Sequence, residues 1–234
     1  MKKDFVIGVL GGMGTYATIH LFQQYAEAFC AEKEWERPRI VIDNRCTMPS
    51  RVRAFLYGEN IDQLVDEMTE SMQFLAAAGC NRIILACNTS HLFLPRIYKK
   101  APQLESKVIH IIQTCVHSVS AEKTKEVFLL GSEGTIDSRI YQTALEANGI
   151  DCKVPKVEEY SMLRECIESV KQNRYSDRVR EIFLDLVNRY DACILGCTEL
   201  PILYERYKKD VTCTRIYDPL YLGMMKIKEE YDHE

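Results

Sequence analysis

The chain lacks any long apolar run. Of its 234 residues 47% are hydrophobic, but no apolar stretch approaches the roughly 20 residues that cross a bilayer. The N-terminal segment MKKDFVIGVLGG is too short and too rich in glycine for a secretory leader. We therefore expect a cytoplasmic protein that makes no membrane contact.

An excess of positive charge and any low-complexity segment are also missing. The 34 acidic residues outnumber the 30 Lys and Arg, and the net charge is -4. A negative surface repels phosphate backbones, so nucleic acid is not an expected partner. With 7 Pro and 11 Gly the composition is that of an ordinary globular protein, long enough for one large domain or two modest ones. A small ligand is the expected partner.

Paired cysteines are absent although the chain is rich in cysteine. There is no C-x-x-C pair, and no His stands at metal-ligand spacing. We expect no bound metal, and reduced thiols that lie mostly in the core. The ten cysteines are Cys30, Cys46, Cys80, Cys87, Cys115, Cys152, Cys166, Cys193, Cys197 and Cys213.

Short runs of Val, Ile and Leu alternate with helical patterns along the whole chain. The first helical pattern spans Thr15 to Glu34, and a second from Asn60 to Ala78 carries a one-sided apolar stripe. The runs Ile83–Ala86 and Ala192–Leu195 are apolar at every position, as in strands covered on both faces. This rhythm predicts β-α units and parallel sheets.

Two motifs recur in the same order. LGGMGTYAT at Leu10–Thr18 aligns without a gap with LGSEGTIDS at Leu130–Ser138, and each follows a strand-like run. Later, ILACNTSH at Ile84–His91 is matched by ILGCTELP at Ile194–Pro201. Repetition of both motifs in one order indicates a duplicated plan. We expect an α/β protein of two pseudo-symmetric, doubly wound parallel-sheet domains, formed by residues 1–101 plus 217–234 and by residues 102–216.

Each repeated cysteine stands where a strand ends. Parallel α/β sheets bind ligands at the carboxyl ends of their strands. If the two domains pack about an approximate twofold axis, Cys87 and Cys197 approach one cleft from opposite sides, and we expect the active site there. Two thiols on opposite faces of one carbon are what a proton-transfer racemase needs, because one thiolate removes the α-proton and the other thiol delivers a proton.

Polar residues follow both thiols. Each cysteine precedes a predicted helix, whose N-terminal N–H groups favour a thiolate and can hold a carboxylate. Asn88, Thr89 and Thr198 supply short polar side chains for the same carboxylate. They can equally be plain helix caps.

The motifs GGMGTYAT, MPSR, ACNTSH and GCTELP resemble the aspartate/glutamate racemase family, which works without pyridoxal phosphate, and within it the aspartate racemase branch. The resemblance spans Phe5 to Pro219. It implies that Cys87 and Cys197 are the acid/base pair, that no cofactor is needed, and that the substrate is a small dicarboxylic amino acid held between two domains. It also suggests a homodimer.

The resemblance carries over to further residues. Arg51 of MPSR matches the family's arginine near the side-chain carboxylate of the substrate, for which an Arg fork is well suited. Lys171 matches a family lysine across an alignment gap. As alternatives, Arg51 is a solvated loop cation and Lys171 a charge at a helix end. The residues expected to bind substrate are Met13, Arg51, Asn88, Thr89, Thr135, Lys171 and Thr198.

Some positions depart from the pattern of cell-wall glutamate racemases. At the first turn this chain has Gly11-Gly12-Met13, where those enzymes have a sequence like D-S-G. At the second thiol it has Glu199, where their G-C-T-H sequence has its histidine. We therefore disfavour that enzyme, while the choice between aspartate and glutamate stays open. His91 is expected to pack near Cys87 or to cap its helix, and orienting the thiol is a lesser alternative.

Two other function classes stay open. A nucleotide-binding oxidoreductase is suggested because Gly12 to Ala17 satisfies G-x-G-x-x-A after a strand, and Asp43 ends the next one. However, Asp43 follows the turn by about 30 residues where about 20 is usual, and both cysteines go unexplained. A non-enzymatic carboxylate-binding protein shares the cleft but needs no thiol. Hydantoin racemases and maleate isomerases, which use related chemistry, are lesser alternatives.

Overall fold

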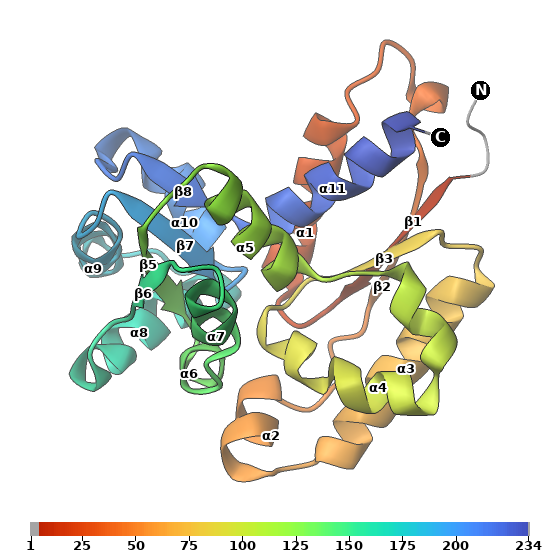
Figure 1. The fold of residues 1–234 in the computed structure, drawn as a ribbon, viewed down its shortest axis with the longest axis horizontal. Coiled ribbons are helices and arrows are strands. Elements are labelled where there is room, and N and C mark those ends of the chain that lie inside the picture. The colour runs from red at the N-terminus through yellow and green to blue at the C-terminus, as the bar shows by residue number, and fades with distance from the viewer. Residues whose placement is uncertain (1–4, 234) are drawn as a thin grey trace. The chain divides into compact units, whose positions relative to one another are not determined.

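The computed structural model describes residues 5–233, and the chain falls into two compact units (Figure 1). Unit 1 comprises Met1–Ile111 and Leu220–Glu234, and unit 2 comprises Ile112–Pro219. The C-terminal segment thus returns to the unit in which the chain begins.

Unit 1 contains four strands, five helices and three short 3-10 turns within its described residues. Its strands are β1 (Val6–Gly11), β2 (Arg39–Asn44), β3 (Arg82–Leu85) and β4 (Val108–Ile109). Its helices are α1 (Thr15–Ala28), α2 (Arg51–Tyr57), α3 (Ile61–Ala77), α4 (Leu94–Lys100) and α11 (Pro219–His233), and the 3-10 turn η2 (Thr89–Phe93) precedes α4. Two further 3-10 turns are η1 (Glu34–Glu36) and η3 (Pro102–Lys107).

Unit 2 repeats the strand plan. Its strands are β5 (Glu126–Gly131), β6 (Asp151–Lys153), β7 (Ala192–Gly196) and β8 (Arg215–Tyr217). Its helices are α5 (Ile111–Ala121), α6 (Glu133–Asp137), α7 (Ile140–Glu146), α8 (Tyr160–Lys171), α9 (Asp177–Val187) and α10 (Leu200–Tyr207). The 3-10 turns η4 (Val157–Glu159) and η5 (Lys208–Asp210) lie before α8 and after α10.

Both sheets are parallel and have equivalent strand orders. The first is β2-β1-β3-β4 and the second is β6-β5-β7-β8. In each, the strand that carries the Gly turn pairs with the strand that precedes the repeated cysteine: Leu10 is opposite Leu85 in one sheet, and Gly131 is opposite Gly196 in the other. The predicted fold class, two doubly wound α/β parallel-sheet units, is confirmed.

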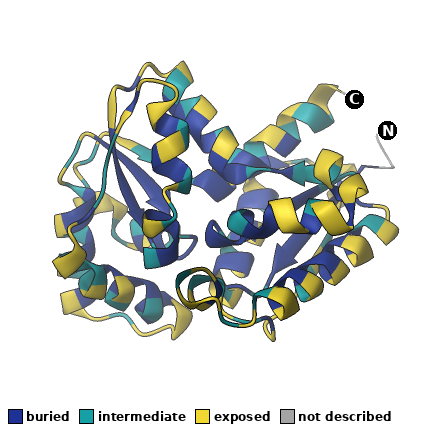
Figure 2. Ribbon diagram, turned by 60° about the horizontal axis from the view of Figure 1, so that its bottom comes forward, coloured by how far each residue is buried: buried dark blue, intermediate teal, exposed yellow. Residues whose placement is uncertain are grey.

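The core of each unit lies between its sheet and its helices. Every residue of β1 and of β7 is buried, as expected for central parallel strands covered on both faces. Figure 2 shows these strands in dark blue and the outer faces of the helices in yellow. The stripe predicted between Asn60 and Ala78 is the buried face of α3, whose five core side chains are at most 2% exposed. These are Leu64, Val65, Met68, Met72 and Leu75.

Three local expectations are wrong. The first helix ends at Ala28 rather than near Glu34, because Phe29 turns to pack against Tyr231 of α11, with ring centroids 5.5 Å apart. Cys87 is followed by η2, and the α-helix begins only at Leu94. Most of the ten free thiols do not lie in the core, since only four are buried. Within residues 5–233, no helix is long and apolar enough to cross a membrane.

Candidate active site

Each unit presents one partly exposed thiol at the carboxyl end of a buried strand. In unit 1, every residue from 83 to 91 is buried except Cys87, which follows β3. In unit 2, every residue from 192 to 200 is buried except Cys197, which follows β7. The same exposure pattern at both repeated motifs selects these two cysteines from the ten.

The turn after β1 lies beside Cys87 because β1 pairs with β3. Gly12 has a φ of +79°, a conformation that favours glycine, and a Cβ there would lie 2.6 Å from the backbone nitrogens of Arg45 and Cys46. The Gly12 N–H donates to Thr18 Oγ1 (3.1 Å). The turns that end β1 and β2 are therefore packed backbone to backbone.

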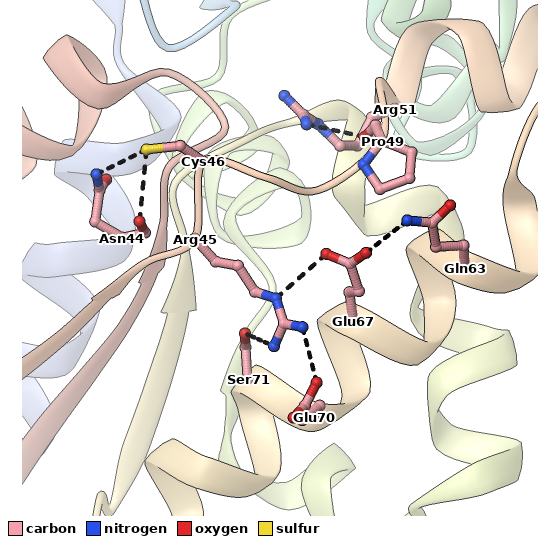
Figure 3. A network of polar contacts seen from close by, with 9 residues as sticks. All are labelled: Asn44, Arg45, Cys46, Pro49, Arg51, Gln63, Glu67, Glu70 and Ser71. Atoms are coloured by element: carbon pink, nitrogen blue, oxygen red, sulfur yellow. Dashed lines mark hydrogen bonds and ion pairs between the residues drawn. The ribbon is translucent and has the colours of Figure 1, made fainter.

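Polar groups gather where β2 ends, as Figure 3 shows. Asn44 Nδ2 donates to the sulfur of Cys46 (3.1 Å), and the Thr15 hydroxyl lies 3.3 Å from the same sulfur. The adjacent Arg45 points the other way, onto α3, where its guanidinium pairs with Glu67 (3.3 Å) and Glu70 (2.8 Å). Burial opposes the charge of Arg45, but the two carboxylates raise its pKa. Arg45 thus fixes the loop between β2 and α2 against α3.

Arg51 begins α2, next to Ser50, which caps the helix by accepting the N–H of Arg53. Its guanidinium donates to the carbonyls of Met13 (2.9 Å) and Pro49 (3.0 Å). Nε of Arg51 is buried and has no hydrogen-bond partner within residues 5–233. Arg51 is therefore a fixed cation joined to the β1 turn rather than a solvated loop cation, and the structure brings it together with the predicted residue Met13.

In unit 2 the thiol of Cys197 has a carboxylate partner. Cys197 Sγ donates to Glu199 Oε2 (3.0 Å), and the Thr198 hydroxyl donates to the same oxygen (3.2 Å). Glu199 is 2% exposed, and its Oε1 has no hydrogen-bond partner in the described chain. Burial raises the pKa of Cys197, the charge and hydrogen bond of Glu199 raise it further, and Lys171 opposes the shift.

Lys171 ends α8 within electrostatic range of this pair. Burial works against its charge, but Glu199, a 2.8 Å hydrogen bond to Glu168 and the charge of Cys197 together raise the pKa of Lys171. It is thus both a helix-end charge and a cation near the thiol. In α6, which follows the neighbouring strand β5, Thr135 is fully buried, and its hydroxyl lies 3.1 Å from that of Ser132, the N-cap of the helix.

The structure places the predicted residues in two groups. Cys87, Met13, Arg51, Asn88 and Thr89 belong to unit 1, and Cys197, Thr135, Lys171 and Thr198 belong to unit 2. Glu199 was noted in the sequence only as a departure from a motif, yet it contacts the thiol directly. The sequence signal that could have found Glu199 is its position as a charged residue shortly after an apolar strand and before another apolar run. No group of three or more His, Cys, Asp or Glu side chains in residues 5–233 is arranged to hold a metal ion.

Comparison with known proteins identifies the family. The model of the Asp/Glu/Hydantoin racemase family matches residues 10–226. The chain belongs to this family. Among curated proteins it is similar to the broad specificity amino-acid racemase RacX of Bacillus subtilis, 25% identical over 219 residues, which is 88% of this chain and 90% of RacX. It is also 26% identical over 159 residues to the glutamate racemase of Aquifex pyrophilus, covering 67% of this chain and 61% of that protein.

Solved structures agree on the fold. The aspartate racemase of Picrophilus torridus aligns over 96% of this chain and 94% of its own, with a TM-score of 0.80 and 24% sequence identity. An aspartate racemase homologue from Pyrococcus horikoshii aligns over 100% of both chains, with a TM-score of 0.74 and 23% identity. The family assignment makes this protein a member of the racemases, whose substrates are small molecules.

Proposed function

We propose that the protein is a cofactor-independent amino-acid racemase that interconverts the L and D forms of aspartate, glutamate or both. The observation that carries this proposal is the repeated arrangement: in each unit one partly exposed cysteine follows a parallel strand whose last residues are all buried. Family membership and the similarity to racemases over nearly the whole chain support it. The aspartate branch is supported by the likeness to the Picrophilus fold, and a wider range of amino acids by the likeness to RacX.

In the proposed mechanism, Cys87 and Cys197 act on opposite faces of the α-carbon of a single substrate. One thiolate takes the α-proton, and the electron pair of the broken C–H bond stays on the α-carbon as a carbanion next to the carboxylate. The opposite thiol then gives its proton to the other face of that carbon. The first cysteine ends as a thiol and the second as a thiolate, so protons balance without a cofactor or metal.

Glu199 distinguishes the two thiols in this scheme. Its carboxylate accepts the Cys197 hydrogen bond, which favours the protonated thiol. We therefore assign Cys197 the proton-donor state in the resting enzyme. The substrate-binding residues are proposed to be Met13, Arg51, Asn88, Thr89, Thr135, Lys171 and Thr198.

Arg51 is proposed to recognise the side-chain carboxylate. Two N–H groups of its guanidinium hold the Met13 and Pro49 carbonyls, which leaves the fork locked in one orientation. A locked fork loses little entropy when it binds a carboxylate. Because the thiols need a reducing compartment to stay active, we place the enzyme in the cytoplasm.

The test is a racemisation assay across both enantiomers of the amino acids, read by chiral chromatography. We expect aspartate or glutamate to be converted in both directions without added pyridoxal phosphate. Conversion of hydantoins alone, or of no dicarboxylic amino acid, would contradict the substrate assignment. A bound nucleotide in the absorption spectrum of the purified protein would favour the oxidoreductase alternative.

A further inference from the structure

The backbone carbonyl of Cys87 accepts two hydrogen bonds from side chains. Ser90 Oγ donates at 2.6 Å, and His91 Nδ1 lies 3.0 Å from the same oxygen. A carbonyl oxygen can only accept, so His91 carries its proton on Nδ1. Both donors are buried, Ser90 at 0% and His91 at 2% exposed. Two buried donors on one carbonyl fix its direction more firmly than one backbone hydrogen bond does.

The second half of the molecule lacks this device. The carbonyl of Cys197 accepts the backbone N–H of Leu200 (3.0 Å). Residues 200 and 201, which correspond to Ser90 and His91, are Leu200 and Pro201, and neither has a donor side chain. The two thiols are therefore supported differently, Cys197 through its sulfur and Cys87 through its carbonyl.

His91 keeps its hydrogen bond over the whole working range of pH. Burial, together with the nearby His110, lowers the pKa of His91 to about 3. The ring of His110 lies 4.8 Å from that of His91, directly after β4. His91 is therefore a neutral ring between the ends of β3 and β4, and its Nε2 has no hydrogen-bond partner among residues 5–233.

An anchored carbonyl determines the geometry of the next peptide. A trans peptide unit is planar, with its C=O and N–H pointing in opposite directions, and the described chain contains no cis bond. Holding the Cys87 carbonyl toward Ser90 and His91 therefore points the Asn88 N–H the other way and fixes the position of the Cys87 Cα, from which the thiol side chain projects. A general base must stay within a fraction of an ångström of its productive position, since a misplacement of about 1 Å can cost about a hundredfold in rate.

We propose that Ser90 and His91 are positioning residues for Cys87, which orient its thiol by holding its carbonyl. This inference rests on the proposed function for its kinetic consequences, but not for its geometry.

Four variants test it. His91→Leu removes the donor at similar volume, and His91→Asn keeps an N–H near the position of Nδ1. Ser90→Ala removes the other bond and disturbs the core least. The matched control is Ser169→Ala, which deletes an equivalent bond from a buried Ser Oγ to the carbonyl of a cysteine three residues earlier, Cys166 (2.7 Å), in α8.

The first measurement needs no substrate. Iodoacetamide labelling at pH 7.5, followed by peptide mass spectrometry, gives the rates of Cys87 and Cys197 in the same molecule. We expect His91→Leu to slow the alkylation of Cys87 about five- to tenfold, because the carbonyl of Cys87 is then held by Ser90 alone and the thiol is no longer kept in one orientation. Cys197 should change less than about twofold, and Ser169→Ala should change neither.

The second measurement is steady-state racemisation. We expect His91→Leu to lower kcat about 10- to 100-fold in both directions with little change in KM, and His91→Asn to recover to within about fivefold of wild type. If folded His91→Leu and Ser90→Ala match wild type in both Cys87 labelling and kcat, the inference is overturned. Selective slowing of Cys87 in a chain that racemises no amino acid would support the positioning and reject the proposed function.

Discussion

Replacing Glu199 by Gln tests the electrostatics of Cys197. The wild-type carboxylate accepts hydrogen bonds from the thiol at 3.0 Å and from Thr198 at 3.2 Å while it is almost fully buried. Glutamine keeps the size and an acceptor oxygen but removes the negative charge. Since that charge opposes thiolate formation, the pKa of Cys197 should fall in the variant.

The size of the fall follows from the hydrogen bond. A hydrogen bond to a charged group contributes about 1.5–3 kcal/mol, roughly twice the contribution of a neutral one. The charge-dependent half, together with the repulsion between thiolate and carboxylate, corresponds to a shift of about one to two pH units. Lys171 is unchanged in the variant and continues to favour the thiolate.

Labelling rates measured from pH 6 to 10 rise as the Cys197 thiol ionises, and the midpoint of that rise gives its pKa. Cys87 in the same molecule serves as an internal reference. We expect the Cys197 midpoint in Glu199→Gln to lie about one to two units below wild type and the Cys87 midpoint to stay in place. The control is Glu168→Gln, which makes the same charge change beside Lys171 without touching the thiol. An unchanged or raised Cys197 midpoint in Glu199→Gln would refute the reasoning.

The remaining predictions concern stability, recognition and cofactors. Gly12→Ala should lower the free energy of unfolding by about 2–4 kcal/mol, since left-handed backbone costs about 1 kcal/mol and overpacking about 1–3. The control is Gly58→Ala, because Gly58 has a φ of +72° but a Cβ there would meet no atom within 4 Å; it should lower the free energy of unfolding by only about 1 kcal/mol. Both losses are measured by urea unfolding followed by circular dichroism, and equal losses in the two variants would contradict the close approach at Gly12. Arg51→Lys should raise KM for the dicarboxylic substrate about tenfold or more, because one ammonium cannot replace the fork; an unchanged KM in steady-state kinetics would count against carboxylate recognition. Dialysis against a chelator should leave the racemisation rate within about twofold of untreated enzyme, and activity that returns only with metal or pyridoxal phosphate would exclude the two-thiol mechanism.

The sequence predicted the fold well because burial in parallel sheets leaves a simple pattern. Strands covered on both faces are apolar at every position, as in Ala192–Leu195, and the stripe of α3 has helical spacing. Repetition of the Gly and Cys motifs then predicted two units of one plan. The bounds of the domains, and the meeting of Cys87 and Cys197 in one cleft, stay predictions.

Side-chain partners were harder to predict because tertiary packing decides them. The contact of Glu199 with Cys197 depends on the turn after β7, and the direction of Arg45 depends on where α3 lies. Cys87 was expected to stand directly before an α-helix, yet η2 intervenes, because Ser90 and His91 bond back to the Cys87 carbonyl. Local sequence names such residues but does not show which atoms they contact.

The most direct test of the two-thiol mechanism is proton exchange in heavy water by the single variants Cys87→Ala and Cys197→Ala. Wild-type enzyme should place deuterium at the α-carbon of newly formed product while early unreacted substrate stays largely unlabelled. In each variant the rate of inversion should fall at least about 10²- to 10⁴-fold below wild type, which is the usual cost of removing a general acid or base. Each should still exchange the α-proton of one enantiomer, and the preferred enantiomer should switch between the two variants. Folded variants that both racemise aspartate and glutamate at wild-type rates would contradict the mechanism and make the two cysteines structural.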